Sequence, residues 1–476
     1  MKTKPIILTL VLMIIIIFTY SVSASEKINV GLYYGDEALQ TLTVAGEELS
    51  FSIPQIPESE QYVITPAATD NLYVSYLSEE DSEKTFPVFV NSAGTYKIAD
   101  ESDYNLIVSP SGNAIRITSD NNTVAVFDLT DGIGVQDFSD YRVSLNDREY
   151  DGKLLIRHEN GNRLSVINRL DIESYLCGVL PYEMSSGWPI EALKAQAVAA
   201  RNYVINNLNR HKLSGFDLCN TTHCQVYRGV AGHAEDCTQA VEETAGVYLY
   251  YDGKPAQTFY FSSSGGRTEN VKDVWGSSFP YLVSVEDTYE KTEEIPSATW
   301  NYNTSFAKLS NQLNGYGVGT VKDVVITSTT DGERVKTLRV FGSNKTIELK
   351  STEFRTLIGN SLIKGTYFTI EKSGGEPLYV LSSKQTVKKN ESAFILSGGG
   401  TVNPAEVSAM LGKDGIKLYE PNYTDLVFKG RGYGHGVGMS QWGARGMAEA
   451  GFTYDQILTH YFTGTELHTE EQTEWN

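Results

Sequence analysis

Residues 179–208 have the sequence VLPYEMSSGWPIEALKAQAVAARNYVINNL, and they contain the clearest helix pattern of the chain. Apolar side chains recur at three- and four-residue intervals over 189–208, which predicts a helix with one buried stripe. Pro189 suits the first turn of such a helix, and Glu191 suits the positive end of its dipole. The segment therefore predicts a long helix packed against a core.

Two polar residues lie at the edges of this stripe. With about 100° of rotation per residue, Arg201 falls on one edge and Tyr203 falls on the other. Edge positions of a packed helix can line a cleft, so both are candidate substrate-binding residues.

Glu183 comes just before this helix, in a predicted turn over 179–184 that Pro181 stiffens. Its apolar neighbours include Leu180 and Met184, and desolvation by such groups raises the pKa of a carboxyl. A raised pKa suits the protonation of a glycosidic oxygen. Glu183 is therefore a candidate general acid, and an ordinary surface glutamate near a helix start is the alternative.

The N-terminus has the pattern of a signal peptide over 1–24. Lys2 and Lys4 precede an apolar run over 6–20, and small residues lead to a cleavage site after Ala24. An uncleaved anchor is the alternative, although the run is shorter than the ~20 residues of a membrane span. We expect an extracytoplasmic protein, secreted or cell-wall associated, with membrane contact only if this segment is retained.

The composition indicates a folded, β-leaning protein, and the strand and helix patterns along the chain predict an α+β fold, strand-rich with a few helices. The 476 residues include 42 Gly and 29 Tyr, and they allow two or three domains at roughly 150 residues each. The patterns predict a β-rich accessory domain over 27–147, a mixed domain in two parts over 154–292 and 425–466, and a strand-rich middle lobe or insertion over 293–424. A net charge of −20 argues against nucleic acid or anionic lipid as a partner, whereas a polysaccharide is compatible with it.

The most glycine-rich stretch is GRGYGHGVGMSQWGA over 430–444. Its glycines allow the backbone to approach a ligand closely, and Tyr433, His435, Gln441 and Trp442 are types that stack on sugar rings or hydrogen-bond to them. No strand–turn–helix unit surrounds the stretch, so we reject a dinucleotide site. The four side chains are candidate sugar-binding residues, and a packed loop with a buried structural histidine is the alternative.

A serine cluster follows a predicted strand in the segment FSSSGGRTE over 261–269. The chain lacks a nucleophile elbow here. We therefore interpret Ser263 and Ser264 as hydroxyls that hold a sugar, with structural turn residues as the alternative.

The cysteines support two interpretations. An even number in an exported chain is typical of disulfides, and the four are Cys177, Cys219, Cys224 and Cys237. Cys219 and Cys224 also have His211 and His223 nearby in sequence, which suits a soft divalent metal such as zinc.

In their order along the chain, these segments resemble the stage II sporulation protein D / LytB family over residues 154–466. The segments that carry the resemblance are LDIESYLCGVLPYEM over 170–184, AARNY over 199–203, FSSSGGRTE over 261–269, DGERVKTLRVFG over 331–342, EFR over 353–355, YGHGVGMSQWGA over 433–444 and HYFTGT over 460–465.

The resemblance implies an activity. Sporulation members of the family are lytic transglycosylases, which cut peptidoglycan strands stripped of their peptides and leave anhydro-muramic acid ends. The family's catalytic acid falls on Glu183, which would protonate the glycosidic oxygen and then accept a proton from the muramic acid O6. Because no separate water is activated, the pair of carboxylates usual in glycoside hydrolases is not required.

The resemblance also implies a metal and partners. Some clostridial members bind zinc through His and Cys, and His211, Cys219 and Cys224 correspond to those ligands, with His223 as a close alternative. Other relatives are amidase modifiers, so the alternative function is a non-catalytic, peptidoglycan-binding activator of an N-acetylmuramoyl-L-alanine amidase. The expected partners are peptidoglycan glycan strands, with a cell-wall amidase or sporulation engulfment proteins as further candidates.

Overall fold

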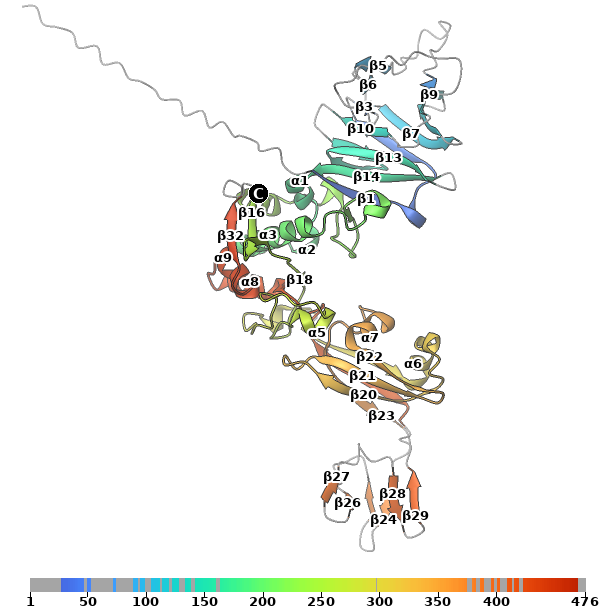
Figure 1. Ribbon diagram of the computed structural model, residues 1–476, viewed down its shortest axis with the longest axis vertical. Coiled ribbons are helices and arrows are strands. Elements are labelled where there is room, and N and C mark those ends of the chain that lie inside the picture. Colours follow the sequence, from blue (N-terminus) through green and yellow to red (C-terminus); the bar gives the residue numbers. More distant parts are fainter. Residues whose placement is uncertain are drawn as a thin grey trace, which may run out of the picture.

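The computed structural model describes residues 27–46, 142–159, 163–296, 298–374 and 423–469, and the backbone of strands between 49 and 137 and between 379 and 418 (Figure 1). The predicted signal peptide lies outside the described residues. Within them, no helix has both the length and the apolar character needed to cross a membrane. The fold is α+β, as the sequence predicts.

Two sheets of mostly antiparallel strands form the N-terminal part. The first has the strand order β15-β1-β14-β13-β10-β3-β6-β5, and the second has the order β12-β11-β2-β7-β8-β9-β4. The bounds are β1 Lys27–Tyr33, β2 Leu42–Gly46, β3 Leu49–Ser52, β4 Leu72–Tyr73, β5 Phe89–Ser92, β6 Thr95–Ile98, β7 Tyr104–Ser111, β8 Ala114–Ser119, β9 Asn122–Phe127, β10 Ile133–Asp137, β11 Arg142–Leu145, β12 Arg148–Asp151, β13 Lys153–Glu159, β14 Arg163–Asp171 and β15 Leu218–Cys219.

Strand β1 joins these sheets to the helical part of the chain. It pairs antiparallel with β14 and parallel with β15, which lies far along the sequence. Its alternating residues Ile28, Val30 and Leu32 are buried in the same apolar core as the long helix. The predicted accessory region thus contributes its first strand to the core of the helical lobe.

The helical lobe is arranged around α3, which spans Ile190–Asn206 and confirms the helix predicted over 189–208. Helices α4, α8 and α9 and strand β16 pack against it. Its small alanine side chains admit neighbours on several sides, so the polar Gln196 and Arg201 are also buried. The remaining elements are α1 Ile172–Cys177, α2 Leu180–Glu183, α4 Glu235–Glu243, β16 Val247–Tyr251, β17 Lys254–Pro255, β18 Tyr260–Phe261, α5 Val271–Trp275, β31 Met439–Ser440, α8 Gln441–Glu449, α9 Tyr454–Tyr461 and β32 Glu466–Thr469.

The middle lobe is an insertion with its own core, which includes Leu338, Phe354 and Phe428. Strand β30 lies between β19 and β23, and β20, β21 and β22 form a second sheet. Figure 1 shows this lobe on the other side of the helical lobe from the N-terminal sheets. Its elements are β19 Thr299–Ser305, α6 Phe306–Gln312, β20 Val321–Thr329, β21 Val335–Gly342, β22 Thr346–Lys350, α7 Ser351–Ile358, β23 Tyr367–Ser373, β24 Tyr379–Leu381, β25 Thr386–Lys388, β26 Ile395–Ser397, β27 Gly400–Val402, β28 Ala409–Gly412, β29 Gly415–Leu418 and β30 Asp425–Arg431.

Candidate active site

Glu183 is the last residue of α2, a single helical turn that the structure forms within the predicted turn over 179–184. Pro181 suits the start of this turn because its fixed φ is already helical. The buried side chains of Leu180 and Met184 flank the glutamate and fix the turn against the core. Their packing places the Glu183 carboxylate at the rim of the helical lobe rather than free in solvent.

The Glu183 carboxylate has the electrostatic environment of a proton donor. Burial raises its pKa, while hydrogen bonds from the Gln441 side chain and the Val226 backbone offset part of that rise. The Gln441 amide Nε2 donates to Glu183 Oε2 at 3.3 Å. This contact joins two residues 258 positions apart in sequence, and it brings two predicted site residues together.

Glu183 lines a cavity of about 540 Å³ between the helical and middle lobes. The wall contains several aromatic side chains, of which Tyr182 is 44% exposed and Trp275 is 43% exposed. Rings with open faces suit stacking on sugars. The lining residues are Tyr182, Glu183, Tyr203, Arg210, Thr222, His223, Cys224, Val226, Phe259, Tyr260, Phe261, Ser262, Trp275, Arg355, Tyr433, Gly434, His435 and Gln441.

The glycine-rich segment enters the cavity beside β18. Strands β18 and β31 pair in parallel, and the Ser263 and Tyr433 backbones form an isolated bridge. At Gly438, φ is +80° and a Cβ would lie 2.1 Å from the Phe259 carbonyl oxygen, so a side chain is excluded there. The resulting path brings Tyr433, His435 and Gln441 to the cavity together.

His435 is neutral in this setting. Burial lowers its pKa to about 3, and the positive charge of Arg355 contributes to the same shift. The Val437 backbone N–H donates to His435 Nδ1 at 3.0 Å, so the ring proton resides on Nε2. The one N–H of His435 therefore hydrogen-bonds to the Tyr260 backbone, and the ring does not carry a positive charge near neutral pH.

A group of two cysteines and two histidines lies next to the cavity, with His223 and Cys224 in its wall. The candidate ligand atoms of His211, Cys219, His223 and Cys224 all lie within 4.8 Å of one another. His211 Nε2 is 3.3 Å from Cys224 Sγ, and His223 Nδ1 is 3.6 Å from Cys219 Sγ. Both separations fall in the range of about 3.3–3.8 Å between ligands of a tetrahedral zinc site, so these donors suit the metal. His223 thus joins the three predicted ligands.

The cysteines form no disulfide, and all four are free thiols in the structure. A hydrogen bond with Cys224 is the main reason that the pKa of Cys219 is lowered, so this pair favours a thiolate. Thiolate is the form in which cysteine binds a metal.

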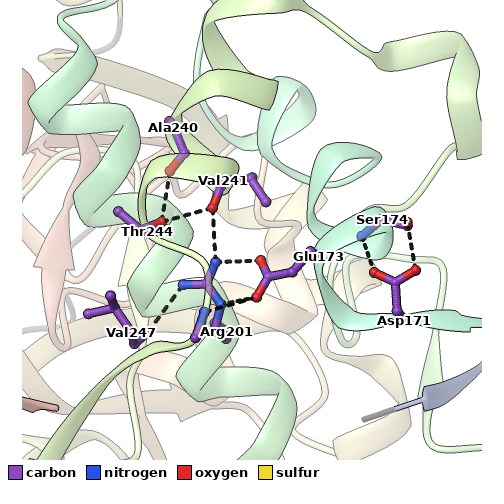
Figure 2. Close-up of polar contacts among 9 residues, drawn as sticks. Asp171, Glu173, Ser174, Arg201, Ala240, Val241, Thr244 and Val247 are labelled. Atoms are coloured by element: carbon purple, nitrogen blue, oxygen red, sulfur yellow. Dashed lines mark hydrogen bonds and ion pairs between the residues drawn. The ribbon is translucent and has the colours of Figure 1, made fainter. Parts of the chain in front are cut away.

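Arg201 does not reach the cavity. It is fully buried, and its Nε and Nη2 donate to Glu173 Oε1 and Oε2 at 2.9 and 2.6 Å (Figure 2). Its guanidinium also donates to the carbonyl oxygens of Val247 and Val241. The predicted sugar-binding arginine therefore joins α1, α3, α4 and β16 in the structure.

The two predicted serines also lie outside the cavity wall, because both are buried against Glu290. Ser263 Oγ donates to Glu290 Oε2 at 3.0 Å, and the Ser264 backbone N–H donates to Glu290 Oε1. Ser440 Oγ, at the N-cap of α8, donates to Glu290 Oε1 at 2.6 Å. Glu290 thereby joins the serine loop to the helix that carries Gln441, a role that no sequence motif indicated.

Trp442 lies beside the cavity rather than in its wall. Its ring packs on Trp188, with ring centroids 4.7 Å apart, and the Arg445 guanidinium lies over both rings. In contrast, Arg210 and Arg355 do line the cavity although the sequence patterns assigned them no role. The segment EFR over 353–355 was the available signal for Arg355.

Comparisons with known proteins identify relatives of most of the chain. A family profile described as stage II sporulation protein matches residues 160–251. An uncharacterized protein of Brachyspira hyodysenteriae is 31% identical over 393 residues, which cover 80% of this chain and 89% of that protein. The amidase enhancer of Bacillus subtilis is 29% identical over 79% of this chain, which spans about half (51%) of that relative. The stage II sporulation protein D of Bacillus amyloliquefaciens is 28% identical over 63% of this chain and 75% of its own length.

Proposed function

This chain belongs to the stage II sporulation protein D family, and on that premise we propose that it is an exported cell-wall enzyme that cleaves peptide-free peptidoglycan strands by lytic transglycosylation. One observation carries the proposal. Among the described residues that line the cavity, Glu183 is the one carboxylate, and burial raises its pKa. A hydrolase would normally require a second carboxylate to activate water, whereas a transglycosylase does not.

The proposed reaction uses Glu183 twice. Its carboxyl proton passes to the glycosidic oxygen as the bond from that oxygen to the anomeric carbon of N-acetylmuramic acid breaks. The O6 of the same sugar then forms a bond to the anomeric carbon, and its proton returns to the Glu183 carboxylate. The products are an anhydro-muramic acid end and a free hydroxyl on N-acetylglucosamine, so no water is consumed.

Several neighbours support this use of Glu183. Gln441 holds the carboxylate at 3.3 Å. Burial raises the pKa of Tyr203 to about 12, so its phenol stays protonated and can donate a hydrogen bond to a sugar. Tyr433 and Trp275 line the cavity and are 36% and 43% exposed, so their rings are accessible to a sugar. These contacts would position the glycan rather than transfer the proton.

We also propose that His211, Cys219, His223 and Cys224 hold a structural zinc ion. The ion would supply a cross-link between the end of α3 and the loop that carries Val226, whose backbone hydrogen-bonds to Glu183. Four protein ligands leave no open position for water, which disfavours a zinc hydrolase. If cleavage were lost with chelator while Glu183→Gln stayed active, the zinc hydrolase would be favoured instead.

Mass analysis of purified, peptide-free glycan strands tests the proposed activity. Incubation with the mature protein, proposed to begin at Ser25, should yield ends that are lighter by one water than hydrolytic reducing ends. Glu183→Gln keeps the size of the side chain and its contact with Gln441 but removes the titrating proton, so it should yield no such ends. Glu235→Gln, at an exposed position of α4, is the matched control. Normal cleavage by the Glu183 variant would exclude the assignment.

A non-catalytic activator of an amidase is the second candidate, and the similarity to an amidase enhancer over 79% of this chain favours it. It would bind the strands without producing new ends and would accelerate a partner amidase. The same incubation, repeated with an amidase and peptide-bearing strands, distinguishes the two.

A further inference from the structure

Arg355 brings a positive charge from the middle lobe to the cavity. It lies in the second half of α7, where its Nε donates to the Ile363 carbonyl oxygen at 2.9 Å. This bond fixes the plane of the guanidinium, and the side chain forms part of the cavity wall. The remaining N–H groups of the planar fork are therefore presented by a rigid element rather than by a mobile loop.

The Arg355 charge has no carboxylate partner among the described residues. Burial lowers its pKa, and no Asp or Glu opposes that shift. The chain has 59 acidic residues against 39 basic ones, so the absence does not reflect a shortage of acids. Elsewhere in the same lobe, Arg339 pairs with Glu348 at 2.9 Å. A partly buried cation without a counterion carries a desolvation cost that an anionic ligand would offset.

The neighbours of Arg355 in the cavity do not supply the missing charge. His435 is neutral because burial, together with the Arg355 charge, lowers its pKa to about 3. Arg210 adds a second cation to the wall, and its own hydrogen bonds go to Asn207 and Tyr203 rather than to a carboxylate. The described wall thus combines one carboxyl, Glu183, with two guanidinium groups.

We propose that Arg355 is a specificity-determining residue that binds a carboxylate carried by the sugar in this cavity, an inference that rests on the proposed function. In a peptide-free strand, N-acetylmuramic acid carries a free lactyl carboxylate, which matches the planar fork of an arginine in a bidentate contact. Attachment of a peptide converts that carboxylate into a neutral amide. The positive charge of Arg355 would therefore favour strands with free carboxylates over strands that carry a peptide.

Two glycan substrates that differ in charge and only slightly in size test the inference. One is the peptide-free strand, and the other is the same strand with its carboxyls coupled to methylamine. The wild-type protein should prefer the free carboxylates in kcat/KM by roughly 10- to 100-fold, the range for hydrogen bonds to a charged group. In Arg355→Gln this preference should largely disappear through a higher KM for the free strands. Arg355→Lys should restore part of it, and Arg339→Gln, which removes the same charge outside the cavity, should leave it unchanged.

Binding to both strands, measured by calorimetry with the Glu183→Gln protein, separates this inference from the proposed activity. If free strands bind more tightly and the difference depends on Arg355, the inference holds even if the wild-type protein cleaves neither strand. If the wild-type protein cleaves and binds both strands equally, the inference is wrong while the proposed activity stands. This last comparison requires no variant, so a folding defect in Arg355→Gln would not obscure it.

Discussion

The buried pair of Arg201 and Glu173 gives the sharpest test of a structural role against a substrate-binding role. Glu173→Gln keeps the shape of the side chain but leaves the fully buried Arg201 cation without its counterion. Breaking a buried ion pair costs about 3–5 kcal/mol, and Glu173 is 28% exposed, so we expect about 3 kcal/mol. For a domain of this size, that loss corresponds to a decrease in Tm of roughly 6–12 °C.

The assay combines thermal unfolding with glycan cleavage well below the unfolding transition. Glu173→Gln and Arg201→Met should each lower Tm, and the double variant should lose less than the sum of the two. The matched control is the surface pair of Arg339 and Glu348, whose side chains are 46% and 49% exposed. Glu348→Gln should cost no more than about 1 kcal/mol. If Arg201→Met unfolds at the wild-type temperature and nevertheless loses cleavage, Arg201 acts on the substrate and the structural role is wrong.

Four further predictions follow from the site and its packing. Because a general acid must hold its proton, activity should fall as pH rises through the raised pKa of Glu183. Gln441→Leu removes a hydrogen bond that lowers this pKa, so the fall should move to higher pH in a kcat/KM profile. A move to lower pH would contradict the role of Gln441. The pKa of Glu183 is higher in the folded protein than in the unfolded chain, so the buried carboxylate destabilises the fold at any pH above the unfolded pKa. Glu183→Gln should therefore raise Tm at neutral pH, and this gain should disappear near pH ~4. No gain at neutral pH would mean that the carboxylate is not desolvated. Dialysis against a chelator should lower Tm by more than about 5 °C, and His223→Ala should reduce the zinc content measured by atomic absorption; full zinc content in that variant would remove His223 from the ligand set. Gly443→Ala should lower the free energy of unfolding in urea by about 1–3 kcal/mol, because its Cβ would lie 2.0 Å from the Tyr461 hydroxyl. Gly315→Ala is the control, since a Cβ there would have no atom within 4 Å. Equal stability of the two variants would show that the helix shifts to make room.

The helices were predictable because their signals are local. The apolar periodicity over 189–208 and the boundary signals there depend on residues within a few turns of one another, and α3 forms over Ile190–Asn206. The capping box of Thr453 and Gln456 at the start of α9 is a local signal of the same kind. Such signals require no knowledge of the rest of the chain.

The site was only partly predictable because its contacts join distant segments. A helical wheel places Arg201 at an edge but cannot tell that α4 and β16 cover that edge. Glu290 contacts Ser263, 27 positions away, and Ser440, 150 positions away, without any motif around it. The spacing of the candidate metal ligands also left His211 and His223 as alternatives, and the fold brings both to the same point.

The way the middle lobe joins the rest of the chain has an evolutionary consequence. The chain leaves through β19 and returns through β30, and these two strands pair along their whole length, with Thr299 opposite Arg431. An insertion whose two ends are adjacent can be exchanged without separating Glu183 from Gln441, since both belong to the helical lobe. Because α7 and Arg355 belong to the insertion, selection could change the proposed carboxylate contact by exchanging a module while Glu183 and Gln441 stay in place.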